Sequence, residues 1–475
     1  MTSTADRIDA AGWRIVLLAS LGGGGWPDLS DVQSPAMIGS ESPVASVPDA
    51  HDRMSAAGWR IVLLASLGGT LEFYDFVIFG VFAGDIAQTI FPNTSPTVSL
   101  MASFAAFAAG YLARPIGGVV LSHYGDRHGR RTVFLWSVFI MSGATLGMGL
   151  VPSYAQWGVM ASALMVTLRL IQGFCLGGEL PGALTYVVET APRIAPFVCG
   201  VVFACVTMGV ALATGVSLSV RTFLDPALVP EYGWRIAFIL GGLGGVLSFV
   251  LRRSLEESPE FARMKSFAVR QPFLELLRTN LVHVLVGCAI LAGTGTFNGL
   301  FFSHLPAYLT AVLKYDPRQA VFAQTIGVIA SAIGILVTGW LGDRIPPRYL
   351  LRTGVALLLV FAMPFYGALE SRSVDLTTLC VLAGLSAGLT NGAFAVLLTD
   401  LFPTRIRFTG VALVFNVAFT IFSGTAPLVA TSLIQSTGSL TSPWYLMVFS
   451  AALALIGSLW VEKYGGNVMK RAGEL

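Results

Sequence analysis

The chain has 475 residues, of which 55% are hydrophobic and only 12% are charged, with a mean hydropathy of +0.74 and a formal net charge of +3. Soluble domains carry about 25% charged residues, so this composition cannot cover a water-facing surface. The small net charge gives no reason to expect nucleic-acid binding, and the five scattered cysteines form neither a disulfide nor a metal-binding pattern. The composition therefore predicts an all-α membrane protein with many spans, and we expect no metal and no cofactor.

The first 54 residues differ from the rest of the chain. The segment 10–23, AAGWRIVLLASLGG, recurs identically at 56–69, but its first copy has too few apolar residues to cross a membrane core that needs about 20. A linker rich in Gly, Ser, Pro and Asp follows it. We expect residues 1–54 to be disordered or to be an over-extended start with Met54 as an alternative initiator. A short signal-like segment is the other alternative, although its flanks fit poorly.

Apolar stretches of spanning length then follow one another to the end of the chain. The twelve expected spans are 58–88, 98–122, 132–152, 157–187, 197–221, 234–252, 281–311, 320–341, 350–369, 375–399, 408–434 and 443–462. A polar stretch divides them into two sets of six. We predict two pseudo-symmetric six-helix bundles at 55–252 and 281–465, joined by a cytoplasmic linker at 253–280 and followed by a cytoplasmic tail at 466–475.

Basic residues predict the orientation of these spans. The loops after spans 2, 4, 6, 8 and 10 and the C-terminal tail hold 18 Lys and Arg residues, whereas the opposite loops hold 5. Cytoplasmic loops carry the excess of basic residues in membrane proteins. Both termini are therefore expected in the cytoplasm.

A repeated motif supports the division into halves. Gly125-Asp126-Arg127 has a second copy in Gly342-Asp343-Arg344, 217 positions later, and the segments that end spans 4 and 10 repeat at a similar offset. We expect each copy to form a turn, and Asp126 to accept hydrogen bonds from Arg131 or from a neighbouring helix N-terminus. Such a cluster would hold the cytoplasmic side shut; the alternative is membrane anchoring by the basic residues alone. The candidate gate residues are Gly118, Gly125, Asp126, Arg127, Gly129, Arg130, Arg131, Asp343 and Arg344.

Ionisable residues inside the expected spans are the first candidates for function, because they cost several kcal/mol unless they are paired or face water. Glu72 is twelve residues from Arg60, Arg114 is twelve from Asp126 and Arg169 is twelve from Trp157, so each is about 18 Å from one membrane face and near mid-membrane. We expect these mixed charges to pair when the cavity is empty, and a substrate that competes for an arginine to change the proton occupancy of a carboxylate. Fixed ion pairs that lock the helices together are the alternative. The candidate cavity residues are Glu72, Tyr74, Asp75, Arg114, Arg169, Gln172, Glu179, Asn298, Tyr308 and Asn416.

These motifs together resemble the major facilitator superfamily and, within it, the metabolite:proton symporter family. The resemblance runs from Glu72 to Pro427 and includes LEFYDF, ARPIGG with GDRHGRR, RLIQGFCLGGELPGA, ETAP and LFPTRIRFTG. It implies alternating access and uptake driven by protons, with Glu72, Asp75 and Arg114 in the cavity, Arg169 as the coupling arginine and 126–131 as the inner gate. The second gate copy, GDRIPPRYLL, has prolines where the family usually has Gly-Arg, and Phe73 replaces the usual Trp.

We therefore expect a monomeric symporter of the bacterial inner membrane that takes up a small polar metabolite with protons. An organic acid is favoured slightly, because Arg114 and Arg169 offer two cationic partners. The alternatives are a proton-driven exporter of the same fold and a membrane sensor that binds without transport. The sequence shows no nucleophile–base pair or phosphate loop, so an enzyme is not expected.

Overall fold

The computed structural model describes residues 56–466 except 129, 254–275, 277 and 405, and it does not describe 1–55 or 467–475. The duplicated N-terminal segment, most of the expected linker and the tail therefore lie outside the described residues. The described residues form one compact unit. The described residues fold entirely into helices and their connections, as the composition predicts.

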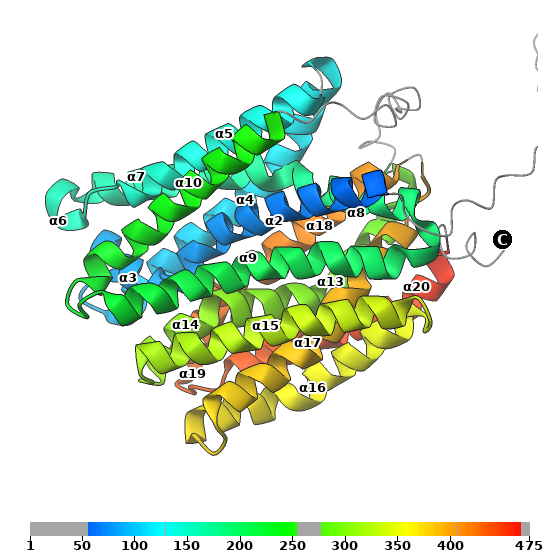
Figure 1. The fold of residues 1–475 in the computed structure, drawn as a ribbon. Helices are drawn as coiled ribbons and strands as arrows, with labels where there is room; N and C mark the ends of the chain where they lie inside the picture. The colour runs from blue at the N-terminus through cyan, green and yellow to red at the C-terminus, as the bar shows by residue number, and fades with distance from the viewer. Residues whose placement is uncertain (1–55, 129, 254–275, 277, 405, 467–475) are drawn as a thin grey trace, which may run out of the picture. The chain divides into compact units, whose positions relative to one another are not determined.

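The N-terminal half of the described chain contains the first expected set of spans (Figure 1). Its helices are α2 (Ala56–Val81), α3 (Ala83–Ile90), α4 (Pro96–His128), α5 (Arg130–Gly149), α6 (Tyr154–Trp157), α7 (Val159–Cys175), α8 (Glu179–Thr190), α9 (Ala195–Phe223) and α10 (Trp234–Arg253). Short 3-10 turns, Leu176–Gly178 and Pro192–Ile194, join α7 to α8 and α8 to α9.

The C-terminal half contains the second set, with three π-helical segments inside its spans. Its helices are α13 (Leu281–Phe297), η7 (Asn298–His304), α14 (Leu305–Ala307), η8 (Tyr308–Val312), α15 (Pro317–Gly342), α16 (Pro347–Ser371), α17 (Leu376–Asp400), α18 (Arg407–Ala418), η9 (Phe419–Gly424), α19 (Ala426–Thr437) and α20 (Pro443–Tyr464).

All twelve expected spans are helical in the structure. Ten described spans are long and apolar enough to cross a membrane, and the pair α2 and α3, bent by 61°, makes an eleventh. The remaining position is filled by the shorter apolar helix Leu135–Gly149 within α5. The outer faces of the bundle are apolar, with Trp136, Leu243, Phe361 and Trp460 exposed, as a surface in contact with lipid requires.

The structure corrects the prediction for the first gate motif. We expected Gly125-Asp126-Arg127 to form a turn, but α4 continues through these residues to His128. Only the second copy turns, because α15 ends at Gly342 and Asp343 follows it. Pro346 and Pro347 explain the difference, since a proline disfavours helical conformation in the residue before it and lacks the N–H that continues a helix.

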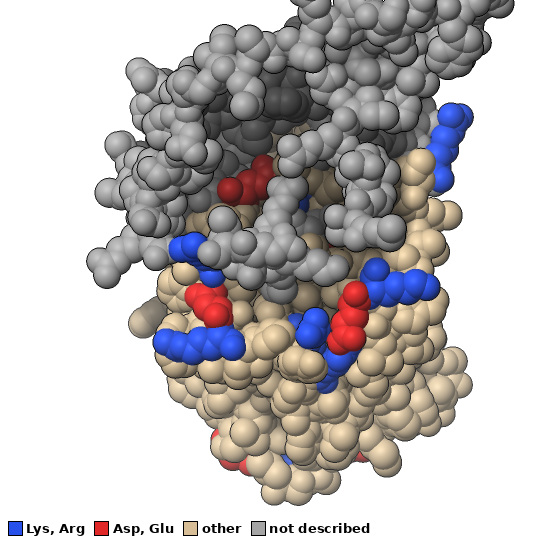
Figure 2. Space-filling view, turned by 90° about the vertical axis from the view of Figure 1, so that its right-hand side faces the viewer, with Lys and Arg blue, Asp and Glu red and all other residues tan. Residues whose placement is uncertain are grey.

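The two halves pack against each other along α9 and α15, which lie side by side in Figure 1. The two backbones touch near one end, where a Cβ on Gly200 would lie 3.1 Å from the Cα of Gly339. We call this end, where α8, α15 and α17 finish, the Asp343 end, and the opposite one, where α3 lies, the Asp85 end. Figure 2 looks at the Asp343 end and shows basic and acidic side chains in adjacent positions on it.

Candidate functional site

Arg169 lies inside the N-terminal half with no exposed surface. Its Nη2 donates to the backbone oxygen of Phe76 at 2.9 Å, and Nη1 donates to Oε1 of Gln172. The guanidinium also lies over the rings of Phe76, Phe79 and Phe107, with the nearest ring centre 3.9 Å away. A cation–π arrangement of this kind compensates for part of the lost hydration. Arg169 is therefore engaged by α2 and α4 of its own half.

Gln172 extends this network to Asp75. Its Nε2 donates to Oγ1 of Thr145 at 2.8 Å and to the backbone oxygen of Asp75 at 3.1 Å. The Thr145 hydroxyl approaches Oδ2 of Asp75 at 3.5 Å, while Oδ1 of Asp75 has no hydrogen-bond partner. The Asp75 carboxyl fits between α2, α5 and α10 because Gly241 has no side chain: a Cβ there would lie 2.3 Å from Oδ1.

Arg114 lies at the boundary between the halves and is 1% exposed. Its guanidinium carbon lies 5.4 Å from the ring centre of Phe76, 5.2 Å from that of Tyr111 and 5.8 Å from that of Phe415. The first two rings belong to the N-terminal half and the third to α18 of the C-terminal half. Its Nε and Nη1 have no hydrogen-bond partner. Arg114 thus keeps two nitrogens without a partner, whereas Arg169 keeps only its Nε.

Pairing among the buried charges was expected, and for Asp75 it is not found. None of the ion pairs between described side chains joins Asp75 to Arg114 or Arg169. Glu72 is buried. The Tyr74 hydroxyl donates to the backbone oxygen of Ala237 on α10 at 2.9 Å and so is used within the N-terminal half.

The position of Glu179 also follows from the structure. It begins α8 just after the 3-10 turn, and its side chain lies outside the described part. The structure therefore gives its place on the fourth span but not its contacts.

The C-terminal half contributes neutral polar groups. Asn298 of η7 and Asn391 of α17 exchange amide hydrogen bonds of 3.1 and 3.2 Å. Asn416 makes a hydrogen bond between the halves, from its Nδ2 to the backbone oxygen of Gly177. Its Oδ1 has no hydrogen-bond partner. Tyr308 instead donates to the backbone oxygen of Leu440 at 2.8 Å, close to the Asp85 end.

Two buried residues were not among the sequence candidates. Asn391 forms the amide pair described above, and a polar amide in the middle of the span 375–399 was the available signal. His304 of η7 lies against the ring of Phe104 in α4, with centres 5.5 Å apart, and its Nε2 is 3.3 Å from Oγ1 of Thr431. An ionisable residue inside the seventh span is a candidate by the same rule that selected Arg114.

At the Asp343 end, two polar contacts join the halves. Oδ1 of Asp343 accepts a hydrogen bond of 3.2 Å from the backbone nitrogen of Phe197, at the start of α9. Nη1 of Arg407 in α18 pairs with Oε1 of Glu189 in α8 at 2.8 Å, and Nε of Arg407 donates to the carbonyls of Thr399 and Phe402 at the end of α17. Asp343 thus accepts from a helix N-terminus, which is one of the partners that we predicted for Asp126 in the first copy of the motif.

Partial burial raises the pKa of Asp343 above its ordinary value, and this rise is opposed by the Phe197 N–H and by the charge of Arg344. Arg344 itself lies over the ring of Trp340 at 3.7 Å. The side chains of Asp126, Arg127, Arg130 and Arg131 and the residue Gly129 lie outside the described part, so the gate role of this motif, Gly125 included, stays a prediction. Gly118 is described, and a Cβ there would lie 3.0 Å from the backbone oxygen of Gly177.

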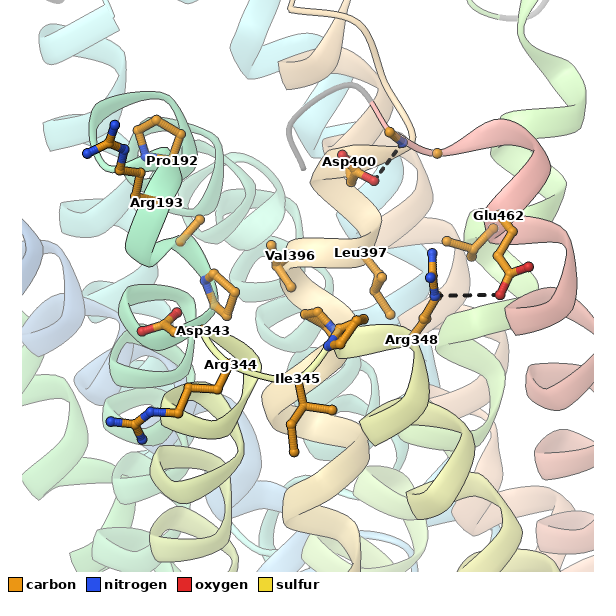
Figure 3. A pocket seen from close by; sticks show the side chains of 18 residues that line it. Pro192, Arg193, Asp343, Arg344, Ile345, Arg348, Val396, Leu397, Asp400 and Glu462 are labelled. Carbon is orange, nitrogen blue, oxygen red and sulfur yellow. Dashed lines mark hydrogen bonds and ion pairs between the residues drawn. The ribbon is translucent and has the colours of Figure 1, made fainter. Parts of the chain in front are cut away.

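A pocket of about 540 Å³ opens at the Asp343 end, with walls from both halves (Figure 3). Pro192, Arg193 and Pro196 form the N-terminal wall, and 342–348, with parts of α17 and α20, form the other. Within it Arg348 pairs with Glu462, and Asp400 accepts from the backbone nitrogen of Gly466. Among the described residues, no group of three or more His, Cys, Asp or Glu is arranged to hold a metal.

Comparison with known proteins adds the family. The model of the Major Facilitator Superfamily matches residues 65–423. The chain belongs to this superfamily. It is 34% identical over 406 residues to a citrate-proton symporter of Klebsiella pneumoniae, covering 85% of this chain and 91% of the relative. A putative proline/betaine transporter of Staphylococcus aureus is 32% identical, with 82% and 84% covered.

Solved structures agree with this assignment at the level of the fold. The crystal structure of a D-xylose-proton symporter matches with a TM-score of 0.67 at 18% identity, and the match covers 86% of this chain and 98% of that one. The major facilitator fold, with twelve helices in two pseudo-symmetric bundles, is therefore the architecture of this chain. The limits that we predicted for the bundles and the linker stay predictions.

Proposed function

We propose that this protein takes up a small, carboxylate-bearing metabolite together with protons, by alternating access across the bacterial inner membrane. The observation that carries the proposal is Arg114, a buried guanidinium at the boundary of the two halves with N–H donors left for a ligand. The similarity to citrate-proton symporters and to proline/betaine transporters supports both the proton coupling and the class of substrate.

The Asp343 end is the cytoplasmic face in this proposal. Among the basic residues that predict orientation, the described Arg193, Arg344 and Arg348 lie at this end. Both termini then lie in the cytoplasm, and the protein works as a monomer surrounded by lipid.

Contacts between the halves at both ends fit a state that is closed on each side. At the Asp85 end, Nε of Arg318 in α15 donates to the backbone oxygen of Arg221 in α9 at 2.8 Å. Nearer the middle, the hydroxyl groups of Tyr111 and Ser423 lie 3.2 Å apart. At the Asp343 end, the Arg407–Glu189 pair and the Asp343–Phe197 hydrogen bond join the two halves. In this proposal, opening at one end breaks the contacts between the halves at that end and keeps those at the other end.

Asp75 is the proposed proton carrier. Its carboxyl is buried, has one oxygen without a partner and forms no ion pair within the described residues. A buried carboxylate in such a place costs several kcal/mol, and taking up a proton removes this cost. Thr145 and Gln172 connect the carboxyl to Arg169, so the network transmits a change of charge from α2 to the fourth span.

Uptake into proteoliposomes with an imposed pH gradient tests the proposal. Inward proton flow should drive accumulation of carboxylate-bearing metabolites, and a protonophore should abolish it. Arg114→Ala should abolish uptake while the protein remains in the membrane, and Arg114→Lys, which keeps the charge, should retain part of it. Unchanged transport in Arg114→Ala would remove Arg114 from the mechanism. If a protonophore raised the amount of substrate that accumulates in cells, the protein would be an exporter. If the protein bound substrate without transporting it, the protein would be a sensor.

A further inference from the structure

The rings around Arg114 form a cation site that both halves build. We use the name aromatic cage for the rings of Phe76, Tyr111 and Phe415, which all lie within 5.8 Å of the guanidinium carbon. The ring faces carry negative electrostatic potential, and cations positioned over them are attracted. In this structure the cation over the cage is Arg114 itself.

The cage is held in place by its own contacts. Phe76 and Tyr111 pack edge to face, with ring centres 4.6 Å apart, and the Tyr111 hydroxyl is tied to Ser423. Phe415 stacks on Phe419 with centres 4.3 Å apart. Rings fixed in this way need little ordering when a ligand arrives, which favours binding.

Of the two buried arginines, Arg114 is the better placed to receive a carboxylate. Both Nη groups of Arg169 donate inside its own half, to Gln172 and to the Phe76 carbonyl, and only its Nε has no partner. Arg114 keeps Nε and Nη1, and it faces the boundary of the halves. The slight preference for an organic acid assumed that both arginines were available to substrate. A tricarboxylate would bring three negative charges to a single guanidinium, and buried charges that stay unpaired are costly.

The opposite wall offers neutral groups. Phe415 precedes Asn416, whose Oδ1 is buried without a partner. Asn416 also lies close to the Arg114 helix, since a Cβ on Gly118, one turn after Arg114, would be 3.4 Å from its Nδ2. A cationic nitrogen at this wall therefore meets aromatic faces and an amide oxygen, with no Lys or Arg of α18 nearby other than Arg407 at the helix start.

We propose that the substrate is a small zwitterion with a single carboxylate and an alkylated ammonium group. The carboxylate binds Arg114 and draws its guanidinium from the rings, and the ammonium group takes its place on the aromatic cage. The inference rests on the proposed function and adds the substrate class to it. Because the cage takes one ring from the C-terminal half, it is complete only when the halves are together around the substrate.

Uptake of glycine betaine, proline and citrate into proteoliposomes under an inward proton gradient tests the proposal. Glycine betaine or proline should accumulate, and citrate in excess should not compete. Proton-coupled uptake of citrate without uptake of either zwitterion would overturn the substrate class and leave the proposed function intact. If none of the three moves and none acidifies the lumen, both proposals fail.

A second measurement tests the cage itself. 3,3-Dimethylbutanoate has the shape of glycine betaine with a neutral tert-butyl group in place of the trimethylammonium, so it binds without a cation–π contribution. Glycine betaine should inhibit at a concentration at least about 10-fold lower than this isostere. Phe415→Leu should remove most of this difference in inhibitory concentration, because it weakens the binding of glycine betaine and not that of the isostere. Phe422→Leu, on the same span but outside the cage, should preserve it. Equal inhibition by both compounds in the unaltered protein would overturn the proposal.

Discussion

Replacing Glu189 with Gln should open the Asp343 end. This substitution removes the charge that pairs with Arg407 and leaves the shape almost unchanged. Breaking a fully buried pair costs about 3–5 kcal/mol, and an exposed pair contributes about 0.2–1 kcal/mol. The side chains of Arg407 and Glu189 are 4% and 23% exposed, and Arg407 keeps its bonds to the end of α17. We therefore expect a loss of about 1–2 kcal/mol, which raises the open population about 5- to 30-fold.

Cys199 reports this opening. It is fully buried next to Gly200, where α9 packs on α15 near the Asp343 end. In a variant whose other cysteines are replaced by serine, N-ethylmaleimide should modify Cys199 about 5- to 30-fold faster when Glu189 is Gln. Glu462→Gln is the matched control, because Glu462 pairs with Arg348 and Arg352 inside the C-terminal half. An unchanged rate in Glu189→Gln, or the same acceleration in the control, would refute the reasoning.

Three further predictions concern stability in detergent, measured by thermal unfolding. Gly173→Ala should prevent folding or lower the free energy of unfolding by more than about 3 kcal/mol, because a Cβ there would lie 1.9 Å from the backbone oxygen of Gly110. Gly143→Ala is the control: a Cβ there would have nothing within 4 Å, so this change should be neutral or slightly stabilising. Equal losses of stability in Gly173→Ala and Gly143→Ala would contradict the close contact at Gly173. Asp85→Asn should destabilise by about 2–4 kcal/mol, because it leaves the Arg221 charge without its partner, and adding Arg221→Met should recover part of the loss. Because the pKa of Asp343 is raised in the folded state, its protonation stabilises the fold; this contribution is complete below the ordinary aspartate pKa and is lost as the pH rises through the raised pKa. Asp343→Asn should therefore reduce the increase in Tm that acidification produces. The same dependence of Tm on pH in the variant and in the unaltered protein would contradict this.

The number and order of the spans could be predicted from the sequence, because apolar length alone decides whether a helix crosses the membrane. The close approach of the second and fourth spans at Gly110 and Gly173 was not predicted, because a glycine allows close packing but does not show which helix packs there. The end of α4 was predicted wrongly, since Gly125 and Asp126 permit a turn but do not force one. The proline pair after Asp343 does force one, and there the prediction holds.

Burial of the charged residues inside the bundle was predictable, but their direction around the helix axis was not. Arg114 and Arg169 are buried as expected, yet one faces the opposite half and the other faces its own. The direction depends on which helices are neighbours, and span length says nothing about this. The same limit explains why the Asn298–Asn391 pair could not be foreseen: each residue was an isolated amide until α17 was placed beside η7.

The uneven distribution of charge between the halves has an electrical consequence. In the described spans, the carboxylates and guanidiniums at mid-membrane (Glu72, Asp75, Arg114 and Arg169) all belong to the N-terminal half, and the facing wall carries amides. A unit charge that moves through a membrane voltage of 100 mV changes in energy by about 2.3 kcal/mol. With both carboxylates ionised these four charges cancel, but when Asp75 takes up its proton the N-terminal bundle carries a net charge of +1, and the resting voltage of the cell then acts on that bundle. Turnover would then depend on voltage even when the cargo itself has no net charge.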